Sequence, residues 1–396
     1  MVVWRESKLG DLFEIKHGFA FKGEHFSDAG DFVLLSPGNF REEGGLKLKG
    51  DKEKFYLGKF PDEYLLKTGD IVVAMTDLIQ NAPILGSSAR IPEDGRFLHN
   101  QRLGKIIDMK VDRVLPEFVY HLFNLPSVRG QIKGSATGST VRHTAPSRIY
   151  DVAVSIPPLP TQQRIAGILS AYDELIENSQ RRIKILETMA RALYREWFVH
   201  FRFPGFENHP RVASALGEIP KGWEVGRLDD VLILQRGFDL PKSVRVEGAI
   251  PIIAATGVTG FHDEARVKAP GVVTGRSGTI GKVMYVQEDF WPLNTALWVK
   301  EFPKAEPLFA YFTLSSVGLE QFNAGAAVPT LNRNDIHGLE TIVPPRNLQK
   351  RFQEIGGTML SQTRSLELKA QNLRRTRDLL LPRLLSGQVS LDKLES

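Results

Sequence analysis

Residues 159–200 decide the fold, and they read LPTQQRIAGILSAYDELIENSQRRIKILETMARALYREWFVH. Prolines cluster at the start of this stretch, where proline can precede a helix but cannot sit in its interior. Thr161 is predicted to be the N-cap, because its hydroxyl can accept a hydrogen bond from a backbone N–H of the first turn. Apolar residues then recur at alternating spacings of four and three, which is the heptad pattern of a helix packed along another helix. At 1.5 Å per residue, this helix would be about 55 Å long.

A helix so long needs a partner, and the partner is expected further along the same chain. Residues 344–386 also begin with two prolines, and the shift in numbering that lays Pro157 on Pro344 also lays Gln162 on Gln349 without a gap. The alternative, two unrelated amphipathic helices, would not require a common register, whereas a fixed internal period decides the architecture. The predicted coiled-coil seam consists of Ile165, Leu169, Tyr172, Ile176, Ile183, Leu186, Leu193, Leu366, Leu373 and Leu380.

A globular module precedes each predicted helix. In the first module, short apolar runs bounded by Gly, Pro and Asn, such as residues 31–35 and 69–75, indicate buried strands. Residues 114–132 look helical in two pieces broken at Pro126, and residues 149–156 are predicted to form the last strand.

The second module repeats the first. Trp4 near the start of the first module is echoed by Trp223 in the second, and Gly138 is echoed by Gly325 at the same shift that relates the two helices. A framework that recurs while its loops differ is expected of a scaffold that carries its specificity on loops. The predicted organisation is a first module (1–158), a long helix (159–201), a linker (202–222), a second module (223–345), a second long helix (346–386) and a tail (387–396).

Composition excludes several classes of protein. Apolar residues make up 42% and charged residues 24% of the 396-residue chain, as in soluble globular proteins, and no apolar run approaches the length of a membrane span. The absence of cysteine excludes disulfides and thiolate metal sites, and it fits a reducing cytoplasm. The formal net charge is +5, and residues 346–386 alone carry nine basic and three acidic residues. This basic helix is either a solvated face or a surface that docks an acidic protein or a phosphate backbone.

Catalytic motifs are missing. Residues 275–283 resemble a phosphate-binding loop, but the spacing is one residue too long and Val283 stands where Ser or Thr would reach magnesium. The sequence favours a turn between two strands there. The nine histidines show no metal-binding spacing, and no Gly-rich cofactor fingerprint or nucleophile elbow occurs. Together these absences favour a binding protein over an enzyme, with no cofactor of its own.

The order of module, long helix, linker, module and long helix resembles the DNA-specificity subunit of Type I restriction–modification systems. The resemblance spans nearly the whole chain, although Gln162 stands where the family usually has Glu. Three stretches carry the resemblance: residues 156–165 (IPPLPTQQRI), 216–228 (LGEIPKGWEVGRL) and 380–387 (LLPRLLSG).

The resemblance implies an α+β fold in which two similar α/β target-recognition domains, related by a pseudo-two-fold internal repeat, are joined by an antiparallel coiled coil. Each domain would read one half of a bipartite target in double-stranded DNA, and the helices would fix the unread spacer. Two methyltransferase (M) subunits and the restriction/translocase (R) subunits would be the partners. S-adenosylmethionine, ATP and Mg would be used by those partners, so the chain itself would be non-catalytic.

Candidate DNA contacts are polar and basic residues on loops beside the repeated framework, because base edges are read by such side chains and phosphates by Lys and Arg. Arg142 and Arg333 are the preferred candidates, since both lie in the loop before the last repeated strand. The full set is Lys22, Arg41, Asn81, Lys133, Thr140, Arg142, Arg148, Arg236, Lys242, Arg276, Asn332, Arg333 and Asn334.

Two other interpretations stay open from sequence. One is a structural coiled-coil adaptor with two protein-binding modules and no direct DNA contact. The other is a stand-alone enzyme whose site is not recognisable.

Overall fold

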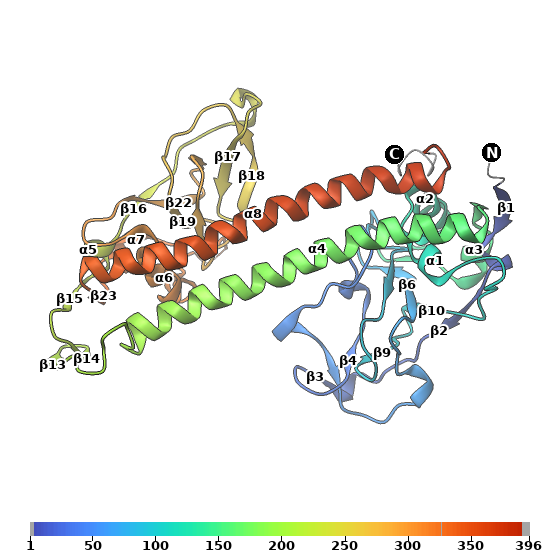
Figure 1. Cartoon of the computed structure of the whole chain (residues 1–396), viewed down its shortest axis with the longest axis horizontal. Coiled ribbons are helices and arrows are strands. Elements are labelled where there is room, and N and C mark those ends of the chain that lie inside the picture. The colour runs from blue at the N-terminus through green and yellow to red at the C-terminus, as the bar shows by residue number, and fades with distance from the viewer. Residues whose placement is uncertain (1–3, 326, 390–396) are drawn as a thin grey trace. The chain divides into compact units, whose positions relative to one another are not determined.

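The computed structural model describes residues 4–325 and 327–389, which divide into two compact units. One unit is residues 1–177 together with 370–396, and the other is residues 178–369. The boundary between the units therefore divides both long helices, α4 (Leu159–Tyr194) and α8 (Arg346–Leu385), so each helix contributes one segment to each unit (Figure 1).

The first module is built around a four-stranded antiparallel sheet in the order β2-β10-β6-β8. A second sheet has the order β3-β5-β4-β9, and β1 pairs with β12. The elements are β1 (Arg5–Lys8), η1 (Leu9–Asp11), β2 (Glu14–His17), η2 (Gly23–His25), β3 (Phe26–Ser27), β4 (Val33–Leu34), η3 (Pro37–Asn39), η4 (Gly50–Lys52), β5 (Phe55–Tyr56), η5 (Asp62–Tyr64), β6 (Ile71–Ala74), β7 (Thr76–Asp77), β8 (Ser88–Arg90), β9 (Phe97–Leu98), β10 (Leu103–Ile107), α1 (Pro116–Phe123), α2 (Pro126–Gly134), β11 (Arg142–His143), α3 (Pro146–Tyr150) and β12 (Ala153–Ile156).

Strand β6 shows why the first module needs an unbroken apolar run. All four of its side chains are buried, because both faces of the sheet are covered. Ile71 and Val73 pack in one cluster with Phe118 of α1, while Val72 and Ala74 pack in another cluster with residues of β4 and β9. Strands buried on both faces are expected to be continuously hydrophobic.

The second module repeats this topology with the sheet order β16-β22-β19-β20. Strand β15 pairs with β23 as β1 pairs with β12, and β17 runs parallel to β21 as β4 does to β9. The elements are β13 (Arg211–Ser214), β14 (Gly217–Pro220), β15 (Glu224–Arg227), α5 (Leu228–Val231), β16 (Ile233–Arg236), η7 (Lys242–Val244), β17 (Ile250–Ala254), β18 (Gly257–His262), β19 (Gly271–Gly275), β20 (Val283–Val286), β21 (Trp291–Pro292), β22 (Ala296–Glu301), α6 (Pro307–Ser316), η8 (Leu319–Phe322), α7 (Arg333–His337) and β23 (Glu340–Val343).

Two pairs of glycines show how closely the repeat is kept. A Cβ on Gly18 would overlap the backbone carbonyl of Asn100, and a Cβ on Gly237 would overlap that of Leu293. Gly138 lies similarly against a carbonyl three residues ahead, and Gly325 does the same. These glycines recur because the backbones approach too closely for any side chain. The predicted internal duplication is confirmed.

The predicted seam lies on the buried side of both long helices. Ile165, Leu169 and Ile176 are buried, and the other seven seam residues are half-buried. Within the first unit α4 packs against α8 through Ile165 and Leu381, and within the second through Tyr194 and Phe352. Residue numbers rise along one helix as they fall along the other, so the helices run antiparallel in each unit.

The start of α4 differs from the prediction. The helix begins at Leu159, and Thr161 already lies within its first turn, with its N–H donating to the carbonyl of Pro158. Thr161 is therefore not the N-cap. At its other end, α4 passes into a π-helical turn, η6 (Arg195–Val199), which buries Trp197 and Phe198.

Gln162 stabilises the entry of α4 in place of a threonine cap. Its fully buried amide accepts from the N–H of Leu115 (2.9 Å) and donates to the carbonyls of Arg113 (2.8 Å) and Pro157 (2.9 Å). Gln349 at the start of α8 is equally buried and makes the same three kinds of bond, to Glu306 N (2.8 Å), Lys304 O (3.0 Å) and Pro344 O (2.8 Å).

Three further predictions are refined. Residues 149–156 are not one strand, because α3 ends at Tyr150 before β12 begins at Ala153. The stretch predicted to be a linker contains the hairpin of β13 and β14. Residues 390–396 of the predicted tail lie outside the described residues. The two helical pieces meeting at Pro126 and the turn between β19 and β20 are confirmed.

Across residues 4–325 and 327–389, none of the helices combines the length and the apolar character needed to cross a lipid bilayer.

Candidate nucleic-acid interface

A cavity of about 640 Å³ opens where three loops of the second module converge. The end of β16 supplies Arg236, the β19–β20 connection supplies Arg276, and the start of α7 supplies its N-cap Asn332 and its first residue Arg333. The structure thus brings together four residues predicted separately from the sequence. Sequence reasoning missed the remaining lining residues, which are Gln235, Gly237, Phe238, Asp239, Leu297, Thr330 and Leu331.

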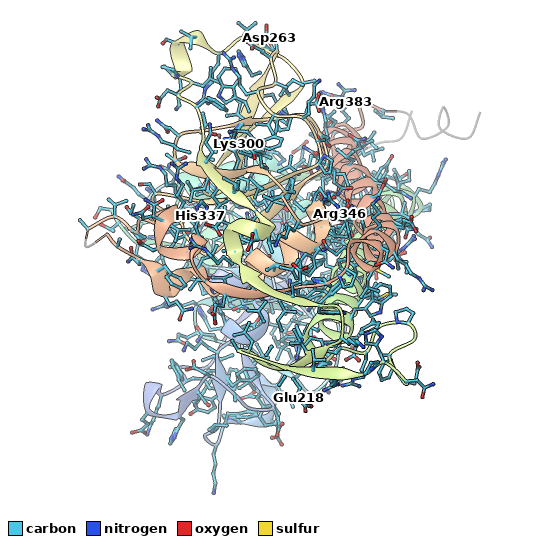
Figure 2. All side chains as sticks on the ribbon, turned by 90° about the vertical axis from the view of Figure 1, so that its left-hand side faces the viewer. Glu218, Asp263, Lys300, His337, Arg346 and Arg383 are labelled. Carbon is cyan, nitrogen blue, oxygen red and sulfur yellow. The ribbon has the colours of Figure 1, made fainter. Side chains whose placement is uncertain are left out.

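Helix α7 is fixed to β16 through a single residue of that strand. Arg333 Nη1 donates to the carbonyl of Leu234 (3.1 Å), and the N–H of Leu234 donates to Nε2 of His337 (3.1 Å; His337 is labelled in Figure 2). Burial lowers the pKa of His337, which favours the neutral ring that can accept this bond. Arg333 remains exposed, so its guanidinium is oriented by the strand while facing solvent.

The other polar groups of the cavity are also oriented by neighbours. Arg276 Nε donates to the carbonyl of Asn294 (2.8 Å), and Asn332 caps α7 by accepting from the N–H of Asn334 (3.1 Å). Arg236 lies 3.5 Å from Asp239, with just over half of its side chain exposed. Three guanidinium groups with partly fixed directions can present donors to an anion or to the acceptor edge of a base.

The equivalent edge of the first module carries different side chains. His17 occupies the position of Arg236, at the end of the first strand of the main sheet. His143 pairs in register with Thr76, and the equivalent bridge of the second module joins Thr330 to Ser277. The Thr76 hydroxyl and His143 Nδ1 are 3.0 Å apart. Sequence reasoning overlooked His17, although the shift that relates Trp4 to Trp223 also lays His17 on Arg236.

Arg142 has a structural contact of its own. Its guanidinium donates to the carbonyls of Lys133 (3.0 Å) and Ala136 (3.4 Å) at the end of α2, and the side chain is half-buried. Arg148 donates to the hydroxyl of Thr137 (3.0 Å). Thr140 lies in the loop between Arg142 and the end of α2, where it is exposed. These residues gather around one loop, and their role as DNA contacts stays a prediction.

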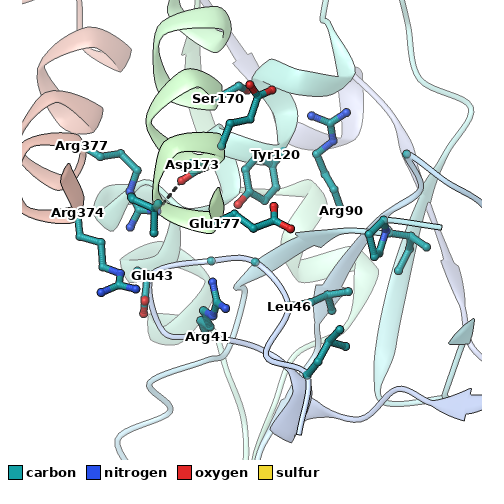
Figure 3. A pocket seen from close by; sticks show the side chains of 18 of the residues that line it. Arg41, Glu43, Leu46, Arg90, Tyr120, Ser170, Asp173, Glu177, Arg374 and Arg377 are labelled. Carbon is teal, nitrogen blue, oxygen red and sulfur yellow. Dashed lines mark hydrogen bonds and ion pairs between the residues drawn. The ribbon is translucent and has the colours of Figure 1, made fainter. Parts of the chain in front are cut away.

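The remaining candidates lie elsewhere. Lys22 immediately precedes η2, and Lys242 begins η7, which is the corresponding place of the second module. Both side chains are exposed. Asn81 is exposed on the loop between β7 and β8. Arg41 does not join these loops, because it lines a separate cavity of about 520 Å³ that also involves α4 and α8 (Figure 3).

A buried polar cluster borders this second cavity. Arg377 donates to Asp173 (2.6 Å), the contact marked in Figure 3. It also donates to Asp378 (2.8 Å), and the Tyr120 hydroxyl bonds to Asp173. Burial raises the pKa of Asp173, while Arg377 and Tyr120 oppose that shift. Next to it, His121 Nε2 lies 3.2 Å from the Ser170 hydroxyl, and burial lowers the pKa of His121 to about 3. These contacts join α1 to α4 and α4 to α8 within the first unit.

No group of three or more His, Asp or Glu side chains in the described part of the chain is arranged to hold a metal ion.

A pair of repeated α/β modules, each packed on segments of two long antiparallel helices and each presenting polar loops at one sheet edge, defines an internally duplicated binding protein. The chain belongs to the family of the Type I restriction modification DNA specificity domain, whose family model matches residues 1–188 and again residues 220–371.

Curated relatives belong to the same family, and a solved structure shares the fold. The chain is 28% identical over 309 residues to the Type I restriction enzyme MjaIX specificity subunit of Methanocaldococcus jannaschii, covering 72% of this chain and 71% of that protein. It is 23% identical over 406 residues to the EcoBI specificity subunit of Escherichia coli, covering 93% and 82%. The crystal structure of a Type-I restriction-modification S subunit from M. genitalium has the same fold, with a TM-score of 0.66 at 17% identity over 97% and 96% of the two chains.

Proposed function

We propose that this chain is the non-catalytic subunit that gives a Type I restriction–modification complex its DNA sequence specificity. In this proposal each module reads one half of a bipartite target in double-stranded DNA. The convergence of Arg236, Arg276 and Arg333 on one loop-lined cavity carries the proposal, because Arg is the side chain best suited to guanine edges and phosphates. The family match over both halves of the chain supports assigning the same role to the first module.

The first module would read a different half-site from the second. Where the second module has Arg236, the first has His17. Where the second has Arg276, the β6–β7 segment of the first has Met75, which is buried in the core and leaves that place without a guanidinium. Side chains with different donors and different shapes at equivalent positions distinguish different bases. A bipartite target with two unlike halves follows from this difference.

We further propose that α4 and α8 fix the unread spacer and dock two methyltransferase subunits, with restriction/translocase subunits joining that complex. The helices expose large apolar side chains on their surface, which supports a docking role. These are Leu175, Ile185, Met189, Ile355, Leu368 and Leu379. S-adenosylmethionine, ATP and Mg would be used by the partner subunits.

The reading role is tested by the substitution Arg333→Ala. The target is first determined by base-resolution methylation profiling of cells that carry the complete system. With a duplex of that sequence, Arg333→Ala should weaken binding by about 1–3 kcal/mol if Arg333 makes a bidentate contact with a base. Lys300→Ala is the control, because Lys300 lies near the opposite end of β22 from the cavity residue Leu297 and pairs with Glu301. Equal affinities of the two variants would remove Arg333 from the reading site.

The spacer role is tested by inserting one heptad into residues 170–190 together with a matching heptad in residues 357–377. Methylation mapping should then give a longer spacer between unchanged half-sites. An unchanged spacer would contradict the proposal that the helices act as a ruler.

A further inference from the structure

The loop after β7 in the first module has no counterpart in the second. Thr76 and Ser277 occupy equivalent places, because each forms a β-bridge with the segment before the last short helix of its module. Thr76 pairs with His143 before α3, and Ser277 pairs with Thr330 before α7. Residues 78–87 then lead to β8, whereas only residues 279–282 lead from the equivalent place to β20. The first module therefore has a longer loop on an otherwise repeated framework.

This longer loop is held by buried side chains at its base. The carboxylate of Asp77 is 1% exposed and accepts from the N–H groups of Ile79 (3.0 Å) and Ile84 (2.7 Å). The buried guanidinium of Arg129 donates to the carbonyls of Leu85 (2.9 Å) and Pro83. A loop fixed at both ends in this way loses little additional conformational entropy when it binds a partner.

The same loop holds two large apolar side chains in solvent. Leu78 is 56% exposed and Ile79 is 58% exposed, although Ala82 and Leu85 of the same loop are buried. An apolar core is therefore available to this loop, yet its first four residues stay exposed; these residues, 78–81, are called the tip below.

The surroundings of the tip are basic and belong to the candidate reading edge. Asp77 of β7 pairs in register with Arg142 of β11. Leu78 is the next residue after Asp77 and therefore begins the loop beside this strand pair. The charged groups around the base of the loop are Arg129, Lys133 and Arg142 against Asp77 and Glu42. An excess of positive charge beside an apolar tip fits nucleic acid better than it fits an apolar protein surface.

We propose that Leu78 and Ile79 form an apolar wedge that enters between stacked base pairs of the DNA bound by the first module. Apolar side chains inserted at a base step partially unstack it and bend the duplex, and the cost is offset by the additional contacts that the bend permits. The step so opened would be a flexible pyrimidine–purine step, at which unstacking costs least. This wedge rests on the proposed DNA-reading function and adds a distortion of the half-site that the second module, with its shorter loop, does not produce.

The experiment uses the full chain assembled with its methyltransferase partner and a duplex of the mapped target. 2-Aminopurine replaces single bases along the half-site of the first module, other than the methylated base, which a methyltransferase itself extrudes from the stack. Its fluorescence rises where stacking is lost. The double variant Leu78→Ser, Ile79→Ser should lose this rise, whereas Leu78→Phe should retain it. Leu57→Ser is the matched control, because Leu57 is 67% exposed in the same module but lies outside the loop.

The outcomes separate the two proposals. The wedge is supported if fluorescence rises at one or two adjacent positions with the wild-type chain and with Leu57→Ser, and does not rise with the double serine variant. It is overturned if the wild-type complex binds the duplex without unstacking any position, or if the double variant unstacks it equally. It is also overturned if the double variant loses its methyltransferase partner while Leu57→Ser keeps it, because the tip would then be a protein contact. Failure of the wild-type complex to prefer this duplex over a scrambled one would refute the DNA-reading function itself.

Discussion

In the first unit, one contact between α4 and α8 is made by charged side chains, whereas the equivalent positions of the second unit are apolar. The shift in numbering that relates the two helices places Asp173 on Leu360 and Ala190 on Arg377. Asp173 and Arg377 form a partly buried ion pair, while Leu360 and Ala190 belong to the apolar core of the second unit.

The helices that cover these positions differ in the same sense. Helices α1 and α6 both place a tyrosine there, Tyr120 and Tyr311, but the next residue is His121 in one and Phe312 in the other. Phe312 contacts Tyr194 at 5.2 Å between ring centroids in a stacked arrangement, whereas His121 faces the Ser170 hydroxyl. One framework is therefore completed by polar contacts in one unit and by aromatic packing in the other.

The contrast between the units shows what a buried ion pair adds to a duplicated fold. An apolar contact is compatible with many pairings of similar helices, but a buried carboxylate is stable only opposite its cation. The ion pair of the first unit thus specifies which segments of α4 and α8 meet. The apolar contact of the second unit adds packing and does not require one particular pairing.

The largest expected effect comes from Arg377→Ala, which leaves Asp173 buried without its cation. We expect the first unit to lose about 3–5 kcal/mol of stability, measured by urea unfolding and by hydrogen exchange in α1. Arg375→Ala is the control, because Arg375 is exposed on the same turn and should change stability by less than about 0.5 kcal/mol. A similar cost for both variants would mean that the ion pair does not distinguish the two units.

A double substitution, Asp173→Leu with Arg377→Ala, gives the first unit the residues of the second. Removing both charges avoids an unpaired buried group, so stability should be unchanged or rise by up to about 1–4 kcal/mol. The measurement is the same urea titration, with Arg377→Ala alone as the reference. A double variant as unstable as the single variant would show that the two sites are not interchangeable.

The two buried glutamines should behave alike, in contrast to the ion pair. Gln162→Ala and Gln349→Ala each leave three backbone groups without partners, so each should cost about 1–3 kcal/mol. Thermal unfolding of the two variants should agree closely. A large difference between them would show that the helix entries are less equivalent than their hydrogen bonds.

The smallest effect concerns pH and the pair His121 and Phe312. The pKa of His121 lies near 3 in the folded chain, below the value of about 6.5 in unfolded chains, so its contribution to stability is complete above pH 6.5 and is lost as the pH falls toward 3. Between pH 7 and pH 5.5 this loss should be about 1–2 kcal/mol. His121→Phe should remove that part of the pH dependence. His99, whose pKa is lowered by burial to about 4, should keep its own part in the variant.

Sequence periodicity predicted the elements that obey local rules. The seam followed from spacing. The repeat followed from one shift along the helices and a second shift at the start of the modules, because both patterns are encoded in residues that face a helix or a sheet core. The start of α4 was misjudged because Thr161 suits an N-cap locally, whereas buried Gln162 satisfies the backbone around the helix entry from a distance.

Long-range polar contacts could not be predicted in this way. Asp173 and Arg377 are 204 residues apart and resemble ordinary surface charges of a helix, so only packing reveals that they are buried together. The candidate DNA site was predicted residue by residue, but the convergence of Arg236, Arg276 and Arg333 depends on three loops of different lengths. Arg142 illustrates the converse, because a loop arginine proved to bind the carbonyls at the end of α2.

The division of both long helices between the units has a consequence for synthesis on the ribosome. The core of the first unit includes Leu381, Leu384 and Leu385 beside Ile165 and Leu169. The module that is translated first therefore waits for nearly the whole polypeptide to emerge before its apolar surface is covered, whereas residues 178–369 can assemble as soon as they are released. A nascent chain stalled before residue 381 would carry an open hydrophobic face on its older half, and exposed apolar surface of this kind is prone to aggregation.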